Sequence, residues 1–253
     1  MSGICKTDEE IALIRASNIL VSKTLGVLSK YIKAGQSTRQ LDTIAEEYIR
    51  DHGAEPAFKG YRGYPATLCT SVNDVVVHGI PSEYVLEEGD IVSVDVGVLS
   101  RGYYGDSAYT FAVGQIKPEI MRLLEATQKA LFLGIENAVA GKRIGDIGFA
   151  IQNYIENNGY SIVREMVGHG IGTHLHEKPE VPNYGRRGAG MVLKKGMVLC
   201  IEPMVNMGKR NIIQDKDGWT IRTQDSLPSA HFELAVMVDE KKANILSTFD
   251  YIN

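Results

Sequence analysis

The pair Asp95 and Asp106 is the first feature of the sequence that could do chemistry. Valines at positions 92, 94, 96 and 98 alternate with other residues, which is the pattern of a β-strand with one buried face. A hairpin turn centred on Ser100 and Arg101 would place Asp95 directly opposite Asp106, with Cβ atoms about 4.5–5.5 Å apart. Like charges at that distance repel, so a sheet would avoid this pair unless a cation lay between them. The sequence therefore predicts a metal site; two exposed aspartates beside a polar turn are the ordinary alternative.

Three residues in the second half of the chain are also of metal-binding types. His169 lies among three glycines, Glu202 ends an apolar run that starts at residue 197, and Glu233 lies on the polar face of an alternating run from 231 to 238. Considered alone, His169 is better explained as a loop residue than as a metal ligand, and each glutamate as a solvated side chain. Together with the two aspartates they supply the carboxylates and the imidazole that a carboxylate-bridged pair of divalent cations needs. Such ligands favour Mn, Fe, Co or Zn, and a water shared by the two cations would become a nucleophile towards a carbonyl near neutral pH.

The elements that must position these residues follow from capping and periodicity. Thr7 with Glu10, and Ser37 with Gln40, form capping boxes that begin two helices, the first running to about residue 31 and the second to residue 53. A loop is expected at 56–65, extended chain at 68–77 and a hairpin at 91–113. A second pair of helices is expected from 118 to 139 and from a cap at Asp146 to residue 159.

The order of these elements repeats. Gly35 and Gly141, like Gly53 and Gly159, lie 106 residues apart, and Gly89 and Gly196 lie 107 apart. Asp95 and Glu202 each follow the last glycine pair by six residues. We interpret the chain as two α-α-β halves, about 7–113 and 118–240, related by an internal duplication. Because no Pro/Gly/Ser-rich linker separates them, we expect a single catalytic domain over residues 1–253.

Composition limits the class of protein. The 253 residues are 44% hydrophobic, with a formal net charge of −4, which gives no global attraction to nucleic acid or to an anionic membrane. The three cysteines form no C-x-x-C pair, which predicts reduced thiols in the cytoplasm. The N-terminus lacks a signal-peptide layout, and no uninterrupted apolar run approaches the ~20 residues of a membrane span.

Several motifs identify a family. His169-Gly-Ile-Gly, Ile201-Glu202-Pro203 and Asp217-Gly218-Trp219-Thr220, together with the Asp-x10-Asp pair, resemble those of type I methionine aminopeptidases, from about residue 7 to residue 238. The resemblance implies an α+β "pita-bread" fold, with two pseudo-symmetric α/β halves around a central antiparallel β-sheet. It also implies co-translational removal of the initiator methionine from nascent proteins whose second residue is small, by attack of a metal-bridging hydroxide on the first peptide bond.

The resemblance assigns roles to individual residues. Two divalent ions (Co, Mn, Fe or Zn) would be held by Asp95, Asp106, His169, Glu202 and Glu233, with Asp106 and Glu233 bridging. The catalytic residues would be His78, which holds the scissile amide, His176, which stabilises the oxyanion, and Glu202, which shuttles a proton. Both histidines would bind substrate, and the methionine pocket would be formed by Phe58, Tyr61, Tyr64, Cys69, Leu175 and Trp219. A monovalent cation (Na or K) would be held by carbonyls of Asn73, Val75 and Ser229.

Three residues differ from the family pattern, and two alternative functions remain open. Phe58, Arg62 and Leu175 replace residues that are more frequent in the bacterial enzymes. One alternative is a prolidase or aminopeptidase P relative, although residue 7 already begins the repeat and an extra N-terminal domain is not expected. The spacing from Glu202 to Glu233 is too short for the insertion of type II enzymes. A second alternative is a non-catalytic pita-bread module that binds RNA or ribosomes.

The expected partners follow from these readings. They are N-termini of nascent polypeptides, with no specific nucleic acid and no membrane. Docking at the ribosome exit region is open, because basic pairs occur at 186–187, 194–195 and 209–210, although such pairs are usually solvated surface. Nothing in the sequence demands an oligomer, so we expect a monomer.

Overall fold

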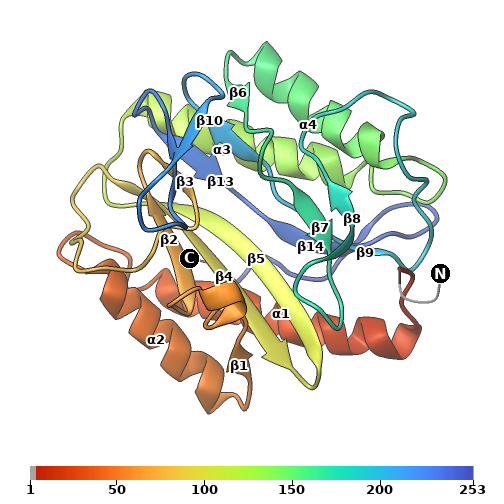
Figure 1. Cartoon of the computed structure of the whole chain (residues 1–253), viewed down its shortest axis with the longest axis horizontal. Helices are drawn as coiled ribbons and strands as arrows, with labels where there is room; N and C mark the ends of the chain where they lie inside the picture. The colour runs from red at the N-terminus through yellow and green to blue at the C-terminus, as the bar shows by residue number, and fades with distance from the viewer. Residues whose placement is uncertain (1–3, 253) are drawn as a thin grey trace.

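Helices in pairs and a curved layer of strands make up the computed structural model, which describes residues 4–252 (Figure 1). The helices are α1 (Asp8–Leu28), α2 (Thr38–Asp51), α3 (Pro118–Ile135), α4 (Ile144–Asn157) and the short 3-10 turn η1 (Tyr61–Gly63). Helices α2 and α4 are both 14 residues long, and their bounds differ by the same 106 residues that separate the paired glycines.

Helices α1 and α2 begin at the predicted caps, but α1 and α3 end earlier than predicted. Thr7 forms the expected box, since its Oγ1 accepts from Glu10 N at 3.2 Å and Glu10 Oε2 accepts from Thr7 N at 2.8 Å. Helix α1 ends at Leu28 and α3 at Ile135, short of the predicted residues 31 and 139. The residues that follow make tight turns instead, with Tyr31 N donating to Leu28 O.

Asp146 does not cap α4. The N-cap is Arg143, and Asp146 lies one turn into the helix, where its carboxylate accepts from Arg143 N at 2.8 Å. The same carboxylate accepts from Gly188 N at 2.8 Å. The prediction found the helix start but assigned the acidic half of the capping arrangement to the wrong position.

Two sheets carry the candidate ligands. In the first-half sheet β4 (Ile91–Ser100) is central, with β1 (Glu55–Pro56), β2 (Leu68–Val72) and β5 (Tyr103–Ala112) around it. The second has the order β15 (Asn244–Ile245), β14 (Leu234–Met237), β9 (Val198–Ile201), β7 (Gly168–Gly170) and β8 (Glu177–Val181). Smaller sheets join β13 (Ser229–His231), β10 (Met204–Asn206) and β6 (Ser161–Ile162), and β11 (Ile212–Gln214), β12 (Ile221–Thr223) and β3 (Val75–Val77). The strand ladders are antiparallel.

The register of the β4–β5 hairpin differs from the prediction. Ser100 pairs with Tyr103, so the turn is formed by Arg101 and Gly102, and Asp106 lies opposite Gly97 rather than opposite Asp95. Asp95 faces Ala108 instead. Because the shift is two residues, both aspartates stay on the same face as diagonal neighbours, about 7–8 Å apart between Cα atoms. The two carboxylates are still neighbours that repel each other, but the predicted placement of Asp95 directly opposite Asp106 is wrong.

Strand β5 joins the two halves. Glu233 N donates to Ala108 O at 2.9 Å, Ser107 Oγ donates to Glu233 O at 2.6 Å, and Thr110 Oγ1 donates to His231 O at 2.7 Å. Glu233 therefore lies in a break between β13 and β14 rather than within one continuous strand. These bonds hold a carboxylate of the second half beside the aspartate pair of the first.

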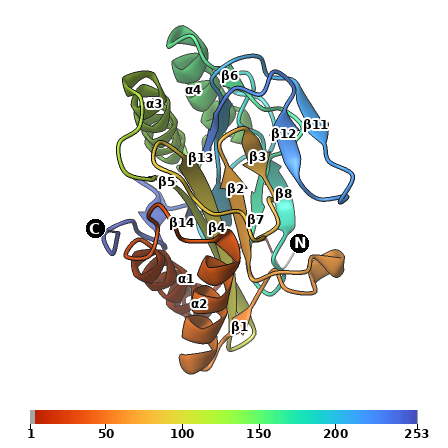
Figure 2. The ribbon, with the colours of Figure 1, turned by 90° about the vertical axis from the view of Figure 1, so that its left-hand side faces the viewer.

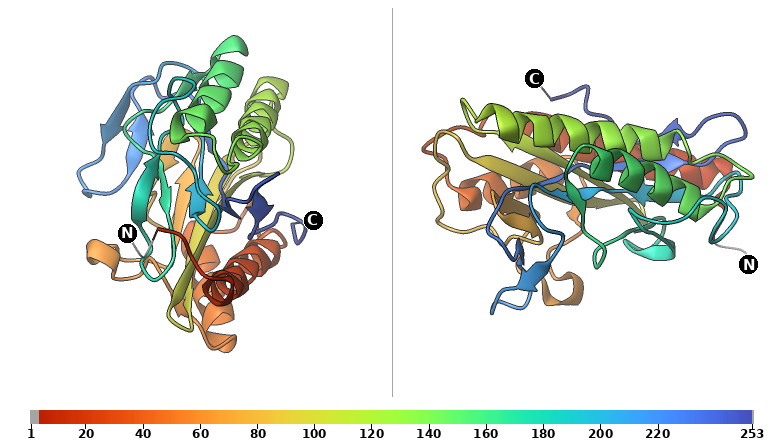
Figure 3. Two further views of the ribbon diagram at one scale, coloured as in Figure 1. Left: turned by 90° about the vertical axis from the view of Figure 1, so that its right-hand side faces the viewer. Right: turned by 90° about the horizontal axis from the view of Figure 1, so that it is seen from above.

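Each helix pair covers its own part of the strand layer. The valines at 92, 94, 96 and 98 are fully buried against Val21, Leu25 and Leu41 of α1 and α2. Residues such as Leu131 and Ile151 of α3 and α4 are buried with Ile201 and Val236. Figures 2 and 3 show the four helices on one side of the strands, while η1 and the β11–β12 hairpin project from the other. The helices thus support the layer from behind the candidate site.

Helix α1 has the length and composition of a membrane span but packs as a core helix. Among the described residues it is the one helix that meets this test, with 21 residues and a mean hydropathy of 1.5 over its most apolar window. Half of that window is buried in the fold, and Gly105 lets the helix approach β5 closely, since a Cβ there would lie 2.6 Å from Asn18 N. Asn18 Oδ1 accepts from Asp106 N at 3.2 Å, so the helix also fixes the backbone at a candidate ligand.

Candidate metal centre and substrate pocket

The five predicted metal ligands converge on one cavity of about 470 Å³. Asp95 comes from β4, Asp106 from β5, His169 from β7, Glu202 from the end of β9 and Glu233 from the break before β14. Nε2 of His169 lies 3.8 Å from Asp106 Oδ2 and 3.6 Å from Glu202 Oε1. Both halves of the chain therefore contribute to a single cluster of four carboxylates and an imidazole.

The ring of His169 is oriented as a ligand would be. Its Nδ1 lies 2.9 Å from Gly170 O, and because a carbonyl only accepts, Nδ1 must carry the proton. The lone pair of Nε2 then faces the carboxylates, which is the arrangement usual for metal-bound histidines. The flanking glycines make room for neighbouring backbone rather than for the ring, since a Cβ on Gly168 would lie 2.3 Å from Cys200 O.

Burial makes the carboxylate charges costly. Asp106 is 3% exposed and Glu233 2%. Burial first, and then the neighbouring carboxylates, raise the pKa of Asp106, Glu202 and Glu233 well above the usual range, and burial raises the pKa of Asp95 to about 6. Burial also lowers the pKa of His169 to about 4, so its imidazole is neutral, as ligation requires.

The residues fit a divalent metal centre. One oxygen each of Asp95, Asp106 and Glu233 is buried without a hydrogen-bond partner. Four potential ligand atoms lie within 4.8 Å of one another, one each from Asp106, His169, Cys200 and Glu233. Buried polar atoms in native proteins are normally satisfied, and bound cations satisfy orphan carboxylate oxygens directly. The donor set, rich in oxygen with one imidazole, suits divalent transition metals.

The predicted substrate-binding residues line the same cavity. They are Phe58, Tyr61, Tyr64, Cys69, His78, Leu175, His176 and Trp219. Tyr64 is anchored through its hydroxyl, which donates to Leu68 O at 2.9 Å and Gly79 O at 3.1 Å, and its ring meets Trp219 edge-on at 5.1 Å. The structure therefore places an aromatic and sulfur-containing wall next to the carboxylate cluster. Arg62 and Leu175, which differ from the residues most frequent in the family, also line this cavity.

His176 and His78 flank this wall in different ways. His176 is exposed, its ring centroid lies 4.3 Å from that of His169 with the two planes tilted by 53°, and its Nδ1 lies 2.9 Å from the Tyr61 hydroxyl. His78 follows β3 with a left-handed φ of 59°, and its ring meets Trp219 edge-on at 6.3 Å. Burial lowers the pKa of His78 to about 4, so its ring is neutral at pH 7.

Two buried residues of the cluster were missed from the sequence. Cys200 is fully buried two residues before Glu202, and His231 is 2% exposed two residues before Glu233, with its Nε2 3.6 Å from Glu202 Oε2 and without a hydrogen bond. The available signal was the period of two in a strand, which places residue i−2 on the same face as residue i. Neither residue belongs to the motifs that carry the resemblance, so the motif search passed over them.

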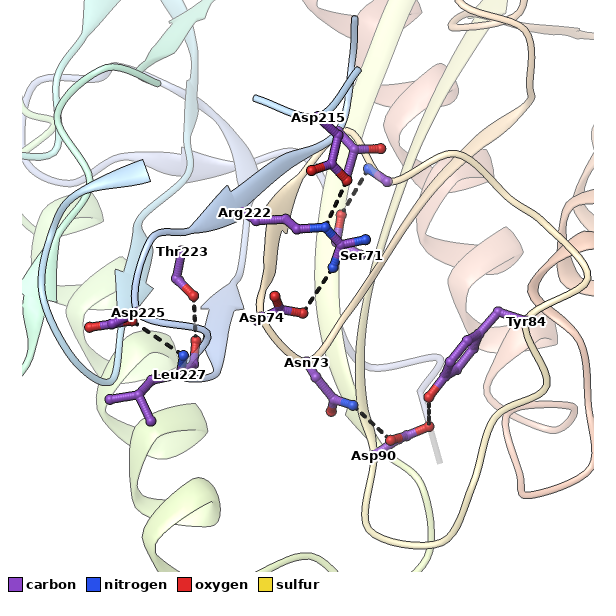
Figure 4. A network of polar contacts seen from close by, with 12 residues as sticks. Ser71, Asn73, Asp74, Tyr84, Asp90, Asp215, Arg222, Thr223, Asp225 and Leu227 are labelled. Atoms are coloured by element: carbon purple, nitrogen blue, oxygen red, sulfur yellow. Dashed lines mark hydrogen bonds and ion pairs between the residues drawn. The ribbon is translucent and has the colours of Figure 1, made fainter. Parts of the chain in front are cut away.

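The expected monovalent-cation residues are also close together. Ser229 N donates to Asn73 O at 2.9 Å, and Val75 begins β3 just beyond the turn at Asn73, whose φ is 52°. Figure 4 shows how this turn is fixed: the side chain of Asn73 donates to Asp90 at 2.7 Å, and Arg222 bridges Asp74 at 3.0 Å and Asp215 at 2.7 Å. The three predicted residues therefore lie in one region, where the Asn73 carbonyl accepts a hydrogen bond from Ser229 N.

Comparisons with known proteins agree with this fold and site. The profile of metallopeptidase family M24 matches residues 12–240. Methionine aminopeptidase of Clostridium acetobutylicum is 48% identical over 96% of this chain and 98% of its own length. The crystal structure of methionine aminopeptidase from Rickettsia prowazekii superposes with a TM-score of 0.95 at 40% identity, over 96% of this chain and 99% of that one. Prolidase from Pyrococcus furiosus gives 0.81 at 25% identity, covering 97% of this chain but 65% of the prolidase.

The fold, the site and these matches define the class of protein, which is a metallopeptidase with the pita-bread fold. The chain belongs to metallopeptidase family M24. The predicted α+β fold is confirmed, since the relatives with this architecture align over nearly the whole chain.

Proposed function

We propose that this chain removes the N-terminal methionine from nascent polypeptides whose second residue is small. The observation that carries the proposal is that one cavity is lined both by the buried carboxylate cluster and by an aromatic, sulfur-containing pocket. A thioether side chain suits such a wall, because sulfur–ring contacts each contribute about 0.3–1.5 kcal/mol. The 48% identity to a methionine aminopeptidase supports the same substrate.

Two divalent ions, Co, Mn, Fe or Zn, would be held by Asp95, Asp106, His169, Glu202 and Glu233, with Asp106 and Glu233 shared between them. Such ions supply an activated water near neutral pH and polarise a carbonyl. A monovalent cation, Na or K, would lie at the carbonyls of Asn73, Val75 and Ser229 and steady the turn before β3. The orphan oxygens of the cluster support the divalent site.

The chain's own residues would divide the remaining work. His176, at the cavity, would donate a hydrogen bond from Nε2 to the carbonyl oxygen as negative charge develops there. Glu202, whose pKa is raised by burial and by Asp95, would carry a proton towards the leaving amine. His78 would hold the scissile amide, and the aromatic wall would exclude water from the methionine side chain.

A tripeptide assay tests this function. Protein reconstituted with Mn or Co should release methionine from Met-Ala-Ser and act poorly on an Xaa-Pro dipeptide. The prolidase alternative, which the lower identity to prolidase does not favour, predicts the reverse preference. Failure to release methionine with any of the four metals would favour the non-catalytic RNA- or ribosome-binding module instead.

The remaining features of the proposal concern the whole protein. We propose one catalytic domain over residues 1–253, because halves 7–113 and 118–240 both contribute ligands to the cluster. It would act in the cytoplasm as a monomer, without specific nucleic acid or membrane binding. Its partners would be nascent N-termini, presented near the ribosome exit region. Free cysteines agree with a reducing compartment.

A further inference from the structure

Cys200 occupies a ligand position that the five-residue set leaves out. It lies on β9 directly opposite His169 of β7 in the ladder, so the two side chains are neighbours, with Cβ atoms about 4.5–5.5 Å apart. It also lies two residues before Glu202, which directly follows β9, and the period of two in extended chain directs both side chains to one side. Two independent placements therefore direct this thiol towards the carboxylate cluster.

The atoms around the thiol are those of a metal site. Four potential ligand atoms lie within 4.8 Å of one another: Sγ of Cys200, a ring nitrogen of His169 and one carboxylate oxygen each of Asp106 and Glu233. All four residues are buried. One oxygen of Asp106 and one of Glu233 lack any hydrogen-bond partner, although these side chains are 97–98% buried. The orphan oxygens point to a missing cation independently of the cysteine.

We propose that Cys200 is a thiolate ligand of one of the divalent ions in this cluster, which makes that position a mixed sulfur, nitrogen and oxygen site. The proposal rests on the proposed metal-dependent function. On binding, the sulfur–metal bond replaces the S–H bond and the proton leaves to solvent. The ordinary alternative is that the thiol only donates a hydrogen bond to Glu233 and stays outside the coordination shell.

A thiolate ligand would change the choice of metal. Sulfur ligands suit Zn, Co and Fe, whereas Mn prefers oxygen ligands. Replacing the sulfur by a hydroxyl in Cys200→Ser should therefore weaken Zn binding by about 10-fold or more and change Mn binding much less. The diagnostic quantity is the ratio of the two affinities, because a general disturbance of the cluster would weaken both alike.

Spectroscopy of the intact protein tests the coordination directly. The Co-loaded protein should show near-ultraviolet charge-transfer absorption from sulfur to cobalt, and X-ray absorption of the Zn-loaded protein should show a sulfur atom at about 2.3 Å. Both signals should vanish in Cys200→Ser. Cys5→Ser is the control, because Cys5 is a free, exposed thiol that does not line the cavity, and this variant should keep both signals.

The outcomes separate this inference from the proposed function. Metal bound through nitrogen and oxygen alone in the unmodified protein overturns the role of Cys200 and leaves the metallopeptidase intact. Persistence of the absorption in a folded Cys200→Ser protein does the same. Failure of the unmodified protein to bind any divalent metal overturns both. The measurements on the unmodified protein do not depend on whether the variant folds.

Discussion

The ring of His176 presents one nitrogen to the cavity because the other is held by Tyr61. The Tyr61 hydroxyl lies 2.9 Å from Nδ1, and in the tautomer that the proposed oxyanion role requires, Nδ1 accepts from this hydroxyl while Nε2 carries the proton. Tyr61→Phe should therefore lower kcat by about 10-fold, the value of one hydrogen bond to this ring. His176→Ala should lower kcat by about 10²–10³-fold with metal content unchanged, as expected for one oxyanion donor.

The double variant separates positioning from packing. If Tyr61 acts only through the imidazole, adding Tyr61→Phe to His176→Ala should cause little further loss, because the two effects are not independent. Multiplicative losses in the double variant would show that Tyr61 contributes to the pocket by itself. Steady-state kinetics on Met-Ala-Ser and metal analysis of each purified variant provide the measurements.

Asp106 differs from His176 because its removal should abolish metal binding and activity together. Its carboxylate is buried among Asp95, Glu202 and Glu233, and in the proposed site it serves both cations. Asp106→Ala should bind neither Mn nor Co with measurable stoichiometry and should release no methionine. Near-normal turnover of this variant would refute the shared carboxylate, and calorimetric titration with each metal checks the binding directly.

His78 gives a pH dependence of stability whose sign follows from its environment. Burial lowers its pKa to about 4 from an unfolded value of 6.5, so below pH 6.5 the unfolded chain binds a proton that the folded chain does not. Stability is therefore lost as pH falls from 6.5 towards 4. Between pH 7.5 and pH 5.5 the free energy of unfolding of the metal-free protein should fall by about 1 kcal/mol more than that of the His78→Asn variant. Asparagine is chosen because it tolerates the left-handed φ of 59° at this position.

Urea unfolding at the two pH values checks this prediction. The comparison with the variant removes the contributions of other titrating groups, which both proteins share. Equal losses in the two proteins would mean that the His78 ring is solvated rather than buried.

The β4–β5 hairpin depends on its turn. Arg101 and Gly102 have φ values of 50° and 80°, the left-handed pair that a tight two-residue hairpin turn requires. Gly102→Val should destabilise the protein by about 1–2 kcal/mol, because a β-branched residue is strained at positive φ. Ser100→Val is the matched control: it lies in regular strand at the edge of the same turn and should have an effect within about 0.5 kcal/mol. Chemical denaturation of both variants measures the difference, and equal effects would contradict the role of the turn.

The same hairpin shows how far sequence reasoning extends. The alternation at 92–98 predicted the strand and its buried face, and the capping pairs at Thr7 and Ser37 predicted the helix starts, because those signals are local. The register was wrong because it depends on the left-handed φ of Arg101, and arginine gives no sequence signal for that conformation. Cys200 was missed for another reason: its relation to His169 exists only across two strands that are 31 residues apart in the chain.

The whole molecule places the cluster where its two halves meet. Backbone and side-chain bonds from β5 to the β13–β14 segment hold Glu233 next to Asp106, and the separate helix-backed cores support each side. Neither half alone presents the full ligand set. Cation binding should consequently stabilise the assembled fold against unfolding, since an unfolded chain cannot bring these residues together.

Metal removal should accordingly lower the melting temperature at pH 7.5. Without a cation, burial raises the pKa of the Asp95 carboxyl to about 6, so the metal-free fold loses stability as pH rises through this range. Mn at 100 times its dissociation constant should add about 2.7 kcal/mol, or about 5–10 °C. At pH 5 the gain should shrink, because protons compete for the same oxygens. Calorimetry with and without EDTA measures both effects; Asp106→Ala should show neither, and a wild-type melting temperature indifferent to EDTA would contradict the metal centre.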